Sequence, residues 1–129
     1  MPFAELHEHR LYFEDTGGPG PAILFSHGFL LDHAMWAPQI AALRGQYRCI
    51  SWDERSHGMS DVRGPFTHWD SARDALGILD VCGVKEAILV GFSQGGFLSL
   101  RAALTAPERV RAMVLIDTAA GVDTPDVVA

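Results

Sequence analysis

Continuous apolar runs alternate with amphipathic stretches along most of this chain. The apolar runs are short and contain β-branched and aromatic side chains, which is typical of strands covered on both faces. We expect strands at residues 3–7, 11–14, 22–26, 47–52, 87–90 and 110–116. We expect helices at residues 35–43, at 68–82 and between Ser93 and Pro107. The alternation predicts the α/β fold class, with a mostly parallel, doubly wound sheet and helices on both faces.

The helix expected at residues 68–82 has recognisable boundaries. Thr67 is a typical N-cap residue, and Gly83 is a typical stop just past a helix C-terminus. Apolar side chains recur at helical spacing between them, which predicts one face packed against the sheet. The residues expected on that face are Trp69, Ala72, Leu76 and Leu79.

A G-x-S-x-G motif lies between an expected strand and an expected helix, at residues 91–95 (Gly-Phe-Ser-Gln-Gly). In that context the motif predicts a nucleophile elbow, a strained turn that holds a serine hydroxyl exposed. Ser93 is therefore the candidate nucleophile, and a plain glycine-rich turn is the alternative. The backbone N–H of Gln94, at the start of the helix, is the first candidate donor to an oxyanion.

The strand expected at residues 22–26 ends in His27-Gly28-Phe29, where such sites draw a second oxyanion donor. We expect the backbone N–H of Phe29 to be that donor. His27 is expected to be structural, with catalytic base as the less favoured alternative. Residues 53–60 (DERSHGMS) follow the next strand, and we expect an ordered turn there rather than an acid/base set.

Weaker signals surround these motifs. The residues that follow the loop His27-Gly28-Phe29 are interpreted as lining an apolar substrate pocket. The alternative is that Trp36 anchors the next helix in the core. The expected pocket residues are Leu30, Leu31, His33 and Trp36. His7 and His9 share a face of the first hairpin but have no evident third ligand, so we expect an exposed hairpin end around a polar turn at residues 8–10 and no metal site.

The motifs HGF, DERSHGMS and GFSQGG, in this order and at this spacing, resemble the α/β-hydrolase fold family. Within it the chain is similar to bacterial carboxylesterases, lactonases and cofactor-free haloperoxidases. The resemblance covers residues 1–129 and implies a single domain's N-terminal half, with the cap and C-terminal part outside this chain. The family more often has glycine where Ser56 stands, which affects that turn and not the nucleophile.

The resemblance also implies an acid and then a histidine after the nucleophile. Residues 94–129 contain no histidine, so the base is expected outside this chain. Some relatives place the acid at a strand end that corresponds to Asp117. The alternative for Asp117 is a strand-end residue that satisfies backbone groups.

Composition narrows the classes of partner. The chain has 129 residues, a net charge of −6 and a pI near 5.4, which argue against nucleic acid or an anionic membrane. The N-terminus is too polar for a signal peptide, and two cysteines in expected core positions are typical of reduced thiols in a cytoplasmic protein.

The last expected strand is apolar throughout, which is typical of a buried position rather than a bare edge. Residues 117–129 are expected to form a loop, so we expect a complementary C-terminal hydrolase fragment to pack there. The sequence thus predicts a serine hydrolase of small carboxylic esters or lactones, acting through an acyl-enzyme without a cofactor. The alternatives are a non-catalytic half that associates with a complementary chain, and perhydrolysis or carbon–carbon bond hydrolysis on the same fold.

Overall fold

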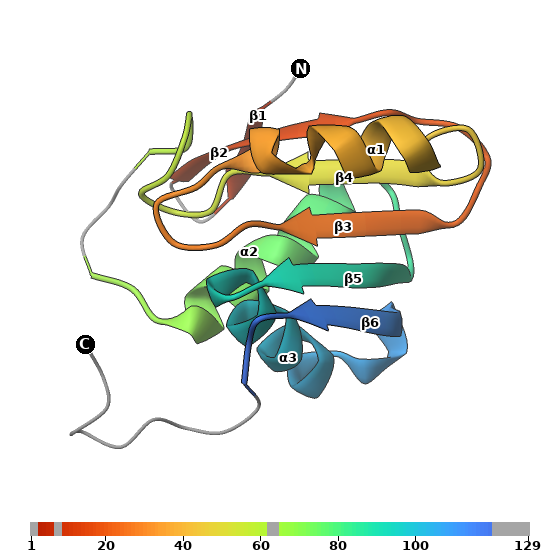
Figure 1. The fold of residues 1–129 in the computed structure, drawn as a ribbon. Helices are drawn as coiled ribbons and strands as arrows, with labels where there is room; N and C mark the ends of the chain where they lie inside the picture. The colour runs from red at the N-terminus through yellow and green to blue at the C-terminus, as the bar shows by residue number, and fades with distance from the viewer. Residues whose placement is uncertain (1–2, 7–8, 62–64, 120–129) are drawn as a thin grey trace.

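The computed structural model of this chain describes residues 3–6, 9–61 and 65–119. Within these residues, the strands form one sheet in the order β1-β2-β4-β3-β5-β6 (Figure 1). The strands are β1 (Phe3–Leu6), β2 (His9–Asp15), β3 (Ala22–Ser26), β4 (Arg48–Trp52), β5 (Ala87–Phe92) and β6 (Val110–Ile116). The helices are α1 (Ala37–Leu43), α2 (His68–Val81) and α3 (Gln94–Thr105), with 3₁₀ turns η1 (His33–Trp36) and η2 (Pro107–Arg109).

The sheet is parallel except at its first two strands. β3 pairs in parallel with β4 and β5, and β5 pairs in parallel with β6, whereas β1 and β2 form an antiparallel edge. All five residues of β3 are buried, as its continuous apolar run predicts. The predicted α/β fold class is confirmed. Because β3 to β6 run in the same direction, the loops that follow them gather at one end of the sheet (Figure 1).

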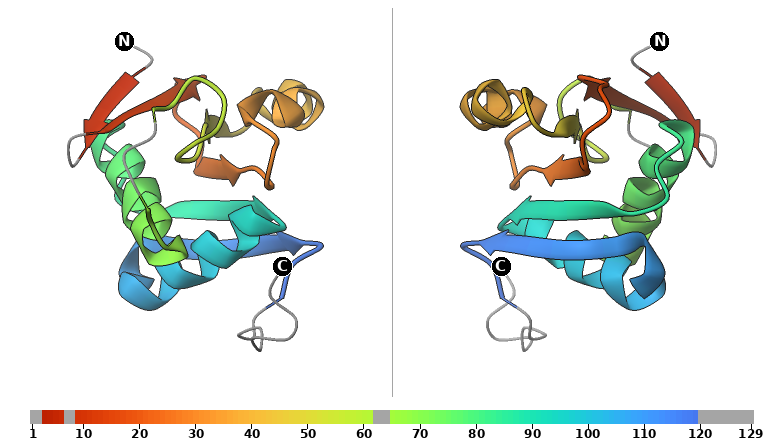
Figure 2. Two further views of the ribbon diagram at one scale, coloured as in Figure 1. Left: turned by 90° about the vertical axis from the view of Figure 1, so that its left-hand side faces the viewer. Right: turned by 90° about the vertical axis from the view of Figure 1, so that its right-hand side faces the viewer.

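Helices cover both faces of the sheet, but unequally. In the edge-on views α1 lies on one face, and α2 and α3 lie on the other (Figure 2). The larger core cluster packs Ile50, Trp52 and Leu89 with residues of α2 and α3. A smaller cluster on the α1 side contains Phe25 and Val90.

The ends of α2 follow the sequence, but its buried face does not. Thr67 and Asp70 form a reciprocal capping box, and Gly83 terminates the helix at a φ of +71°. Ala72 and Leu79 are buried as expected, but Trp69 is 43% exposed, so its predicted core position is wrong. The buried face of α2 is rotated relative to the face that the apolar spacing suggests. It includes Ser71, Asp74, Ala75 and Ile78.

The first hairpin differs from its prediction. β2 begins at His9, so His9 and Arg10 belong to the strand and not to a turn, and His9 is buried rather than exposed. His7 and Glu8 lie outside the described residues, and so does the loop predicted at the end of the chain beyond residue 119.

β6 has the predicted bounds, and among the described residues no strand covers its outer edge, as the sequence predicts. It forms the edge of the sheet beyond β5, and its last four residues are between 36% and 49% exposed. The edge therefore presents a row of large apolar side chains: Met113, Val114, Leu115 and Ile116.

Among the described residues, no helix is both long enough and apolar enough to cross a lipid bilayer.

Candidate active site

Ser93 lies at the sharp turn between β5 and α3, in a backbone conformation that non-glycine residues rarely adopt. Its φ is +53° and its ψ is −111°. The flanking glycines are required by close backbone approach. A Cβ at Gly91 would lie 2.4 Å from the Gly95 carbonyl oxygen, and a Cβ at Gly95 would lie 2.0 Å from the Ser26 carbonyl oxygen. The G-x-S-x-G segment therefore has the strained geometry of a nucleophile elbow.

Residues at the end of β6 hold this turn from the other side. The Ser93 backbone N–H donates to the Ile116 carbonyl at 2.9 Å, and the Thr118 hydroxyl donates to the Ser93 carbonyl at 2.9 Å. Gly96 makes room for that contact, because a Cβ there would lie 2.4 Å from Thr118 Oγ1. Sequence reasoning missed the role of Thr118, since a threonine in a loop carries no spacing signal.

The two candidate oxyanion donors lie on the loops after β3 and β5. Among the described residues, neither the Phe29 N–H nor the Gln94 N–H donates a hydrogen bond within the protein. Leu30, next to Phe29, has a φ of +65°, and Leu31 N–H closes the turn on the Gly28 carbonyl at 3.1 Å. Both N–H groups are thus unused by the described residues, and their role as oxyanion donors stays a prediction.

His27 is fully buried, and both of its ring nitrogens are engaged. Nδ1 lies 2.8 Å from the Gly28 carbonyl, so Nδ1 carries the proton, and Nε2 accepts the Glu54 backbone N–H at 2.9 Å. Burial lowers the pKa of this imidazole to about 4. A neutral ring without a free nitrogen cannot take a proton from Ser93, so the structural interpretation of His27 fits the geometry.

The segment 53–60 is the ordered turn that the sequence predicts. Asp53 is buried, and its carboxylate accepts the N–H groups of His33 and Met59 at 2.8 Å and 2.9 Å. Ser60 donates its hydroxyl to the Asp53 carbonyl at 2.6 Å. Ser56 has a φ of +69°, a region that favours glycine, which accounts for the glycine expected there by resemblance.

Glu54, in the same turn, is a fully buried carboxyl beside the elbow. Its Oε1 accepts a hydrogen bond from Gln94 Nε2 at 2.8 Å. Burial raises the pKa of Glu54 to about 8, the Gln94 hydrogen bond lowers it, and the neighbouring Asp53 carboxylate raises it. The sequence interpretation missed this contact, because nothing in the spacing links residues 54 and 94.

The expected pocket residues do not share one environment. Leu30 and Leu31 are exposed at the oxyanion loop, and Phe29 beside them is 64% exposed. His33 is bound to protein groups, with Nδ1 2.7 Å from Asp53 Oδ1 and Nε2 3.4 Å from a Glu14 carboxylate oxygen. Trp36 is 2% exposed and packs on Phe25, which places it in the core and not in a pocket.

One group of side chains has the composition of a cation site. Ligand atoms of Asp32, His33 and Asp53 lie within 4.8 Å of one another. Asp32 already caps η1 through the Ala34 N–H at 2.8 Å, and Asp53 accepts hydrogen bonds from His33. These ligand atoms serve the fold, and we assign no ion to them.

Asp117 follows β6 immediately, with a φ of +48° and an exposed side chain. Its two neighbours, Ile116 and Thr118, both bond to the backbone of Ser93. The structure thus places Asp117 beside the elbow, as a triad acid would require, and its catalytic role stays a prediction.

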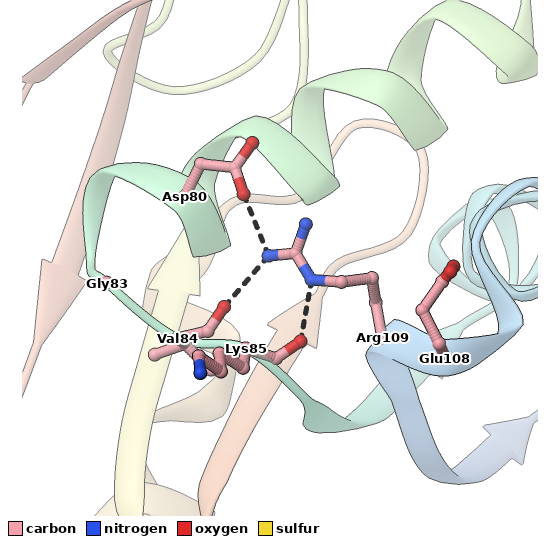
Figure 3. A pocket seen from close by; sticks show the side chains of 6 residues that line it. All are labelled: Asp80, Gly83, Val84, Lys85, Glu108 and Arg109. Carbon is pink, nitrogen blue, oxygen red and sulfur yellow. Dashed lines mark hydrogen bonds and ion pairs between the residues drawn. The ribbon is translucent and has the colours of Figure 1, made fainter.

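A hollow of about 600 Å³ lies at the opposite end of the sheet (Figure 3). The Arg109 guanidinium lies in this hollow. It donates hydrogen bonds to the carbonyls of Val84 at 2.8 Å and Lys85 at 2.6 Å, and it forms an ion pair with Asp80 at 2.8 Å. These contacts tie η2 to the start of β5. The hollow is lined by Asp80, Gly83, Val84, Lys85, Glu108 and Arg109, and none of these residues is a serine, threonine or cysteine.

Comparisons with known proteins agree with this geometry. A family model described as alpha/beta hydrolase fold matches residues 21–128. The curated protein 3-oxoadipate enol-lactonase 1 of Acinetobacter baylyi is 39% identical over 106 residues, which cover 82% of this chain and 40% of that protein.

Two solved structures are similarly close. The enol-lactonase from Burkholderia xenovorans LB400 has a TM-score of 0.91 and 33% identity, over 98% of this chain and 50% of that one. A thermophilic esterase from Thermogutta terrifontis has a TM-score of 0.85 and 36% identity, over 92% of this chain and 44% of that one. The chain therefore spans between 40% and 50% of the length of these three proteins.

Proposed function

Because the chain belongs to the α/β-hydrolase fold family, we propose that it is the nucleophile-bearing part of a serine hydrolase of carboxylic esters or lactones. The observation that carries the proposal is Ser93 at a φ of +53° and a ψ of −111°, in a turn that its glycines make sterically possible. The relatives named as an enol-lactonase and an esterase support the substrate class.

The proposed reaction proceeds through an acyl-enzyme. Ser93 Oγ loses its proton to a base and attacks the substrate carbonyl carbon, and the carbonyl oxygen becomes an oxyanion between the N–H groups of Phe29 and Gln94. Collapse of the tetrahedral intermediate breaks the ester bond and releases the alcohol, which receives the proton. In a lactone that alcohol stays attached to the acyl group. Water then hydrolyses the acyl-enzyme by the same steps, and the proposal requires no cofactor.

The base in this proposal is a histidine from a complementary C-terminal hydrolase segment, and Asp117 is the candidate for the acid that orients it. The exposed apolar edge of β6 supports such a partner, because an unpaired apolar edge strand is a surface for pairing with another strand. Asp117, at the end of that edge, would then meet the incoming segment.

The test is hydrolysis of p-nitrophenyl acetate and of a simple lactone by the chain assembled with its complementary segment. We expect Ser93→Ala to lower kcat at least about 10³-fold, because the nucleophile and base act as a unit. Ser71→Ala is the matched control, since Ser71 is buried in α2 and its hydroxyl has no hydrogen-bond partner among the described residues. A Ser93→Ala assembly that hydrolyses both substrates as fast as the wild type would overturn the proposal.

The competing function is a non-catalytic half whose role is association, and the β6 edge is the observation that favours it. An assembly that forms but hydrolyses nothing would support this alternative. Perhydrolysis or carbon–carbon bond hydrolysis at Ser93 would instead appear as Ser93-dependent turnover of those substrates only.

A further inference from the structure

The turn at residues 53–60 contacts both loops that carry the proposed oxyanion donors. One contact comes from His57. Its Nε2 accepts the Leu30 backbone N–H at 3.0 Å, and its Nδ1 lies 2.8 Å from the Arg55 carbonyl. Because a carbonyl only accepts, Nδ1 carries the proton and Nε2 is a pure acceptor.

This bond fixes the peptide unit directly after Phe29. Leu30 has a φ of +65°, a conformation that is costly for a leucine and needs support from its surroundings. His57 supplies that support, and its ring also packs edge-on against Phe29 with 5.7 Å between ring centroids. The Phe29 N–H belongs to the preceding peptide unit, whose Gly28 carbonyl accepts the Leu31 N–H at 3.1 Å and lies 2.8 Å from His27 Nδ1. His57 acts on this N–H only through the Leu30 backbone and the Phe29 ring.

A return bond from the other loop makes the link reciprocal. His27 accepts the Glu54 backbone N–H at 2.9 Å, and the rings of His27 and His57 lie 4.9 Å apart. Each loop thus contributes one neutral imidazole that accepts a backbone N–H of the other loop. Both rings are buried. The Glu54–His27 bond is therefore shielded from water, whereas the Leu30–His57 bond is partly buried because Leu30 is exposed.

The second contact comes from Glu54 and reaches the elbow. Glu54 Oε1 accepts the Gln94 side-chain amide at 2.8 Å, and Gln94 is the first residue of α3. The backbone N–H of that same residue is the other proposed oxyanion donor. Glu54 is fully buried and Gln94 is half-buried, so this hydrogen bond is partly shielded from water.

We propose that Glu54 and His57 are positioning residues that align the two oxyanion donors, Gln94 N–H through the Gln94 side chain and Phe29 N–H through Leu30. The inference rests on the proposed function for the role of the two N–H groups. Neither residue touches the substrate, and each acts through one hydrogen bond to a neighbouring loop. Oxyanion stabilisation depends on donor placement, so loosening either loop lowers turnover without weakening ground-state binding.

The hydrogen bonds themselves are testable without any turnover. In the nitrogen-labelled 129-residue chain, a through-hydrogen-bond coupling should connect Leu30 N with His57 Nε2, and a second should connect Glu54 N with His27 Nε2. A folded chain that shows neither coupling would overturn the inference, whatever its activity.

Turnover is tested in the assembled enzyme, with active sites counted by a fluorophosphonate. Glu54→Leu and His57→Leu should each lower kcat about 10- to 100-fold with KM changed less than about threefold. Glu54→Gln and His57→Gln retain an acceptor at the end of the side chain, and each should restore most of that loss. A merely structural role would lower the fraction of folded protein and leave kcat per active site unchanged, which would overturn the inference.

The Ser93→Ala assembly separates the two proposals. If it is inactive while the leucine variants keep full kcat per active site, the positioning inference fails and the proposed function stands. If it keeps full activity, the proposed function fails and the positioning inference falls with it.

Discussion

The two ends of the sheet use their polar groups in different ways. At the amino end of the parallel strands β3 to β6, Arg109 donates to two carbonyls and pairs with Asp80, so the guanidinium in the hollow there is already bonded within the fold. At the carboxyl end, Ser93 and Leu30 hold strained backbone conformations, and the N–H groups of Phe29 and Gln94 are unused within the described part of the chain.

Under the proposed function, the difference separates a reactive site from a surface depression. The amino end has a hollow of about 600 Å³, and the Arg109 contacts in it tie η2 to the start of β5. The carboxyl end has strained backbone at Ser93 and Leu30, and the buried side chains of Glu54 and His57 hydrogen-bond to the two loops that carry these residues.

The largest expected loss of stability follows from a substitution at Gly95, where the elbow packs against the end of β3. Gly95→Ala places a Cβ 2.0 Å from the Ser26 carbonyl oxygen, a backbone atom that cannot move aside. We expect a loss of about 3 kcal/mol or more in the free energy of unfolding, or failure to fold. Urea unfolding measures it, and Gly45→Ala, where a Cβ meets nothing within 4 Å, is the control that should stay near neutral. Equal stabilities would contradict the close approach.

A smaller effect is expected at the amino end. Arg109→Gln removes charge-assisted donors from the Val84 and Lys85 carbonyls, which should lower the free energy of unfolding by about 1–2 kcal/mol. Fluorophosphonate labelling of the assembled, folded variant should be unchanged. Arg73→Gln, which breaks an exposed pair with Asp70 within α2, is the control and should change stability by less than about 0.5 kcal/mol. Loss of fluorophosphonate labelling in the folded Arg109→Gln variant would contradict the claim that Arg109 affects stability and not the reactivity of Ser93.

The buried carboxyl at the carboxyl end should make stability depend on pH. Burial raises the pKa of Glu54 to about 8, above its unfolded value near 4.5, so the folded state retains a proton that the unfolded state releases. Its contribution is therefore full below about pH 4.5 and is lost as pH rises toward 8. His27, with its pKa lowered to about 4, acts oppositely and destabilises as pH falls from about 6.5 toward 4.

Glu54→Gln isolates the Glu54 contribution. The stability of this variant relative to the wild type should increase from pH 5 to pH 9, by on the order of 1–3 kcal/mol. Urea unfolding at the two pH values measures it. A difference that does not change with pH would show that the carboxyl is ionised throughout.

The smallest effect is expected at Ser56. Its φ of +69° lies in the region that favours glycine, so Ser56→Gly should raise the free energy of unfolding by about 0.5–1 kcal/mol. Gly83→Ala, at a φ of +71° in open space, is the converse and should lower it by a similar amount. Thermal unfolding compares the two, and a destabilised glycine variant would mean that the Ser56 side chain is needed.

Local features were predictable where the sequence pattern alone decides them. The bounds of β3 and β6 follow from continuous apolar runs. The elbow was predictable because its glycines stand where neighbouring backbone atoms leave no room for a Cβ. The caps of α2 follow from local hydrogen bonding by Thr67 and the freedom of Gly83 to adopt positive φ. The α/β-hydrolase resemblance of the motifs is confirmed by the family match.

Features that depend on tertiary context were not predictable. Trp69 is exposed because the docking of α2 selects a face rotated from the one its apolar spacing suggests. The apolar run of β6 indicates that another segment covers this strand, but it does not indicate which segment does so. The contacts of Glu54 with Gln94 and of His57 with Leu30 join loops distant in sequence, and only the order of the strands brings them together.

The central claim is that Ser93 is a nucleophile held ready at the carboxyl end of the sheet. Its most direct test is the intact mass of the assembled protein after treatment with a fluorophosphonate. We predict a single adduct on the 129-residue chain, located at Ser93 and absent from the Ser93→Ala variant. An adduct that persists in the alanine variant, or an intact assembly that gains no adduct, would contradict it.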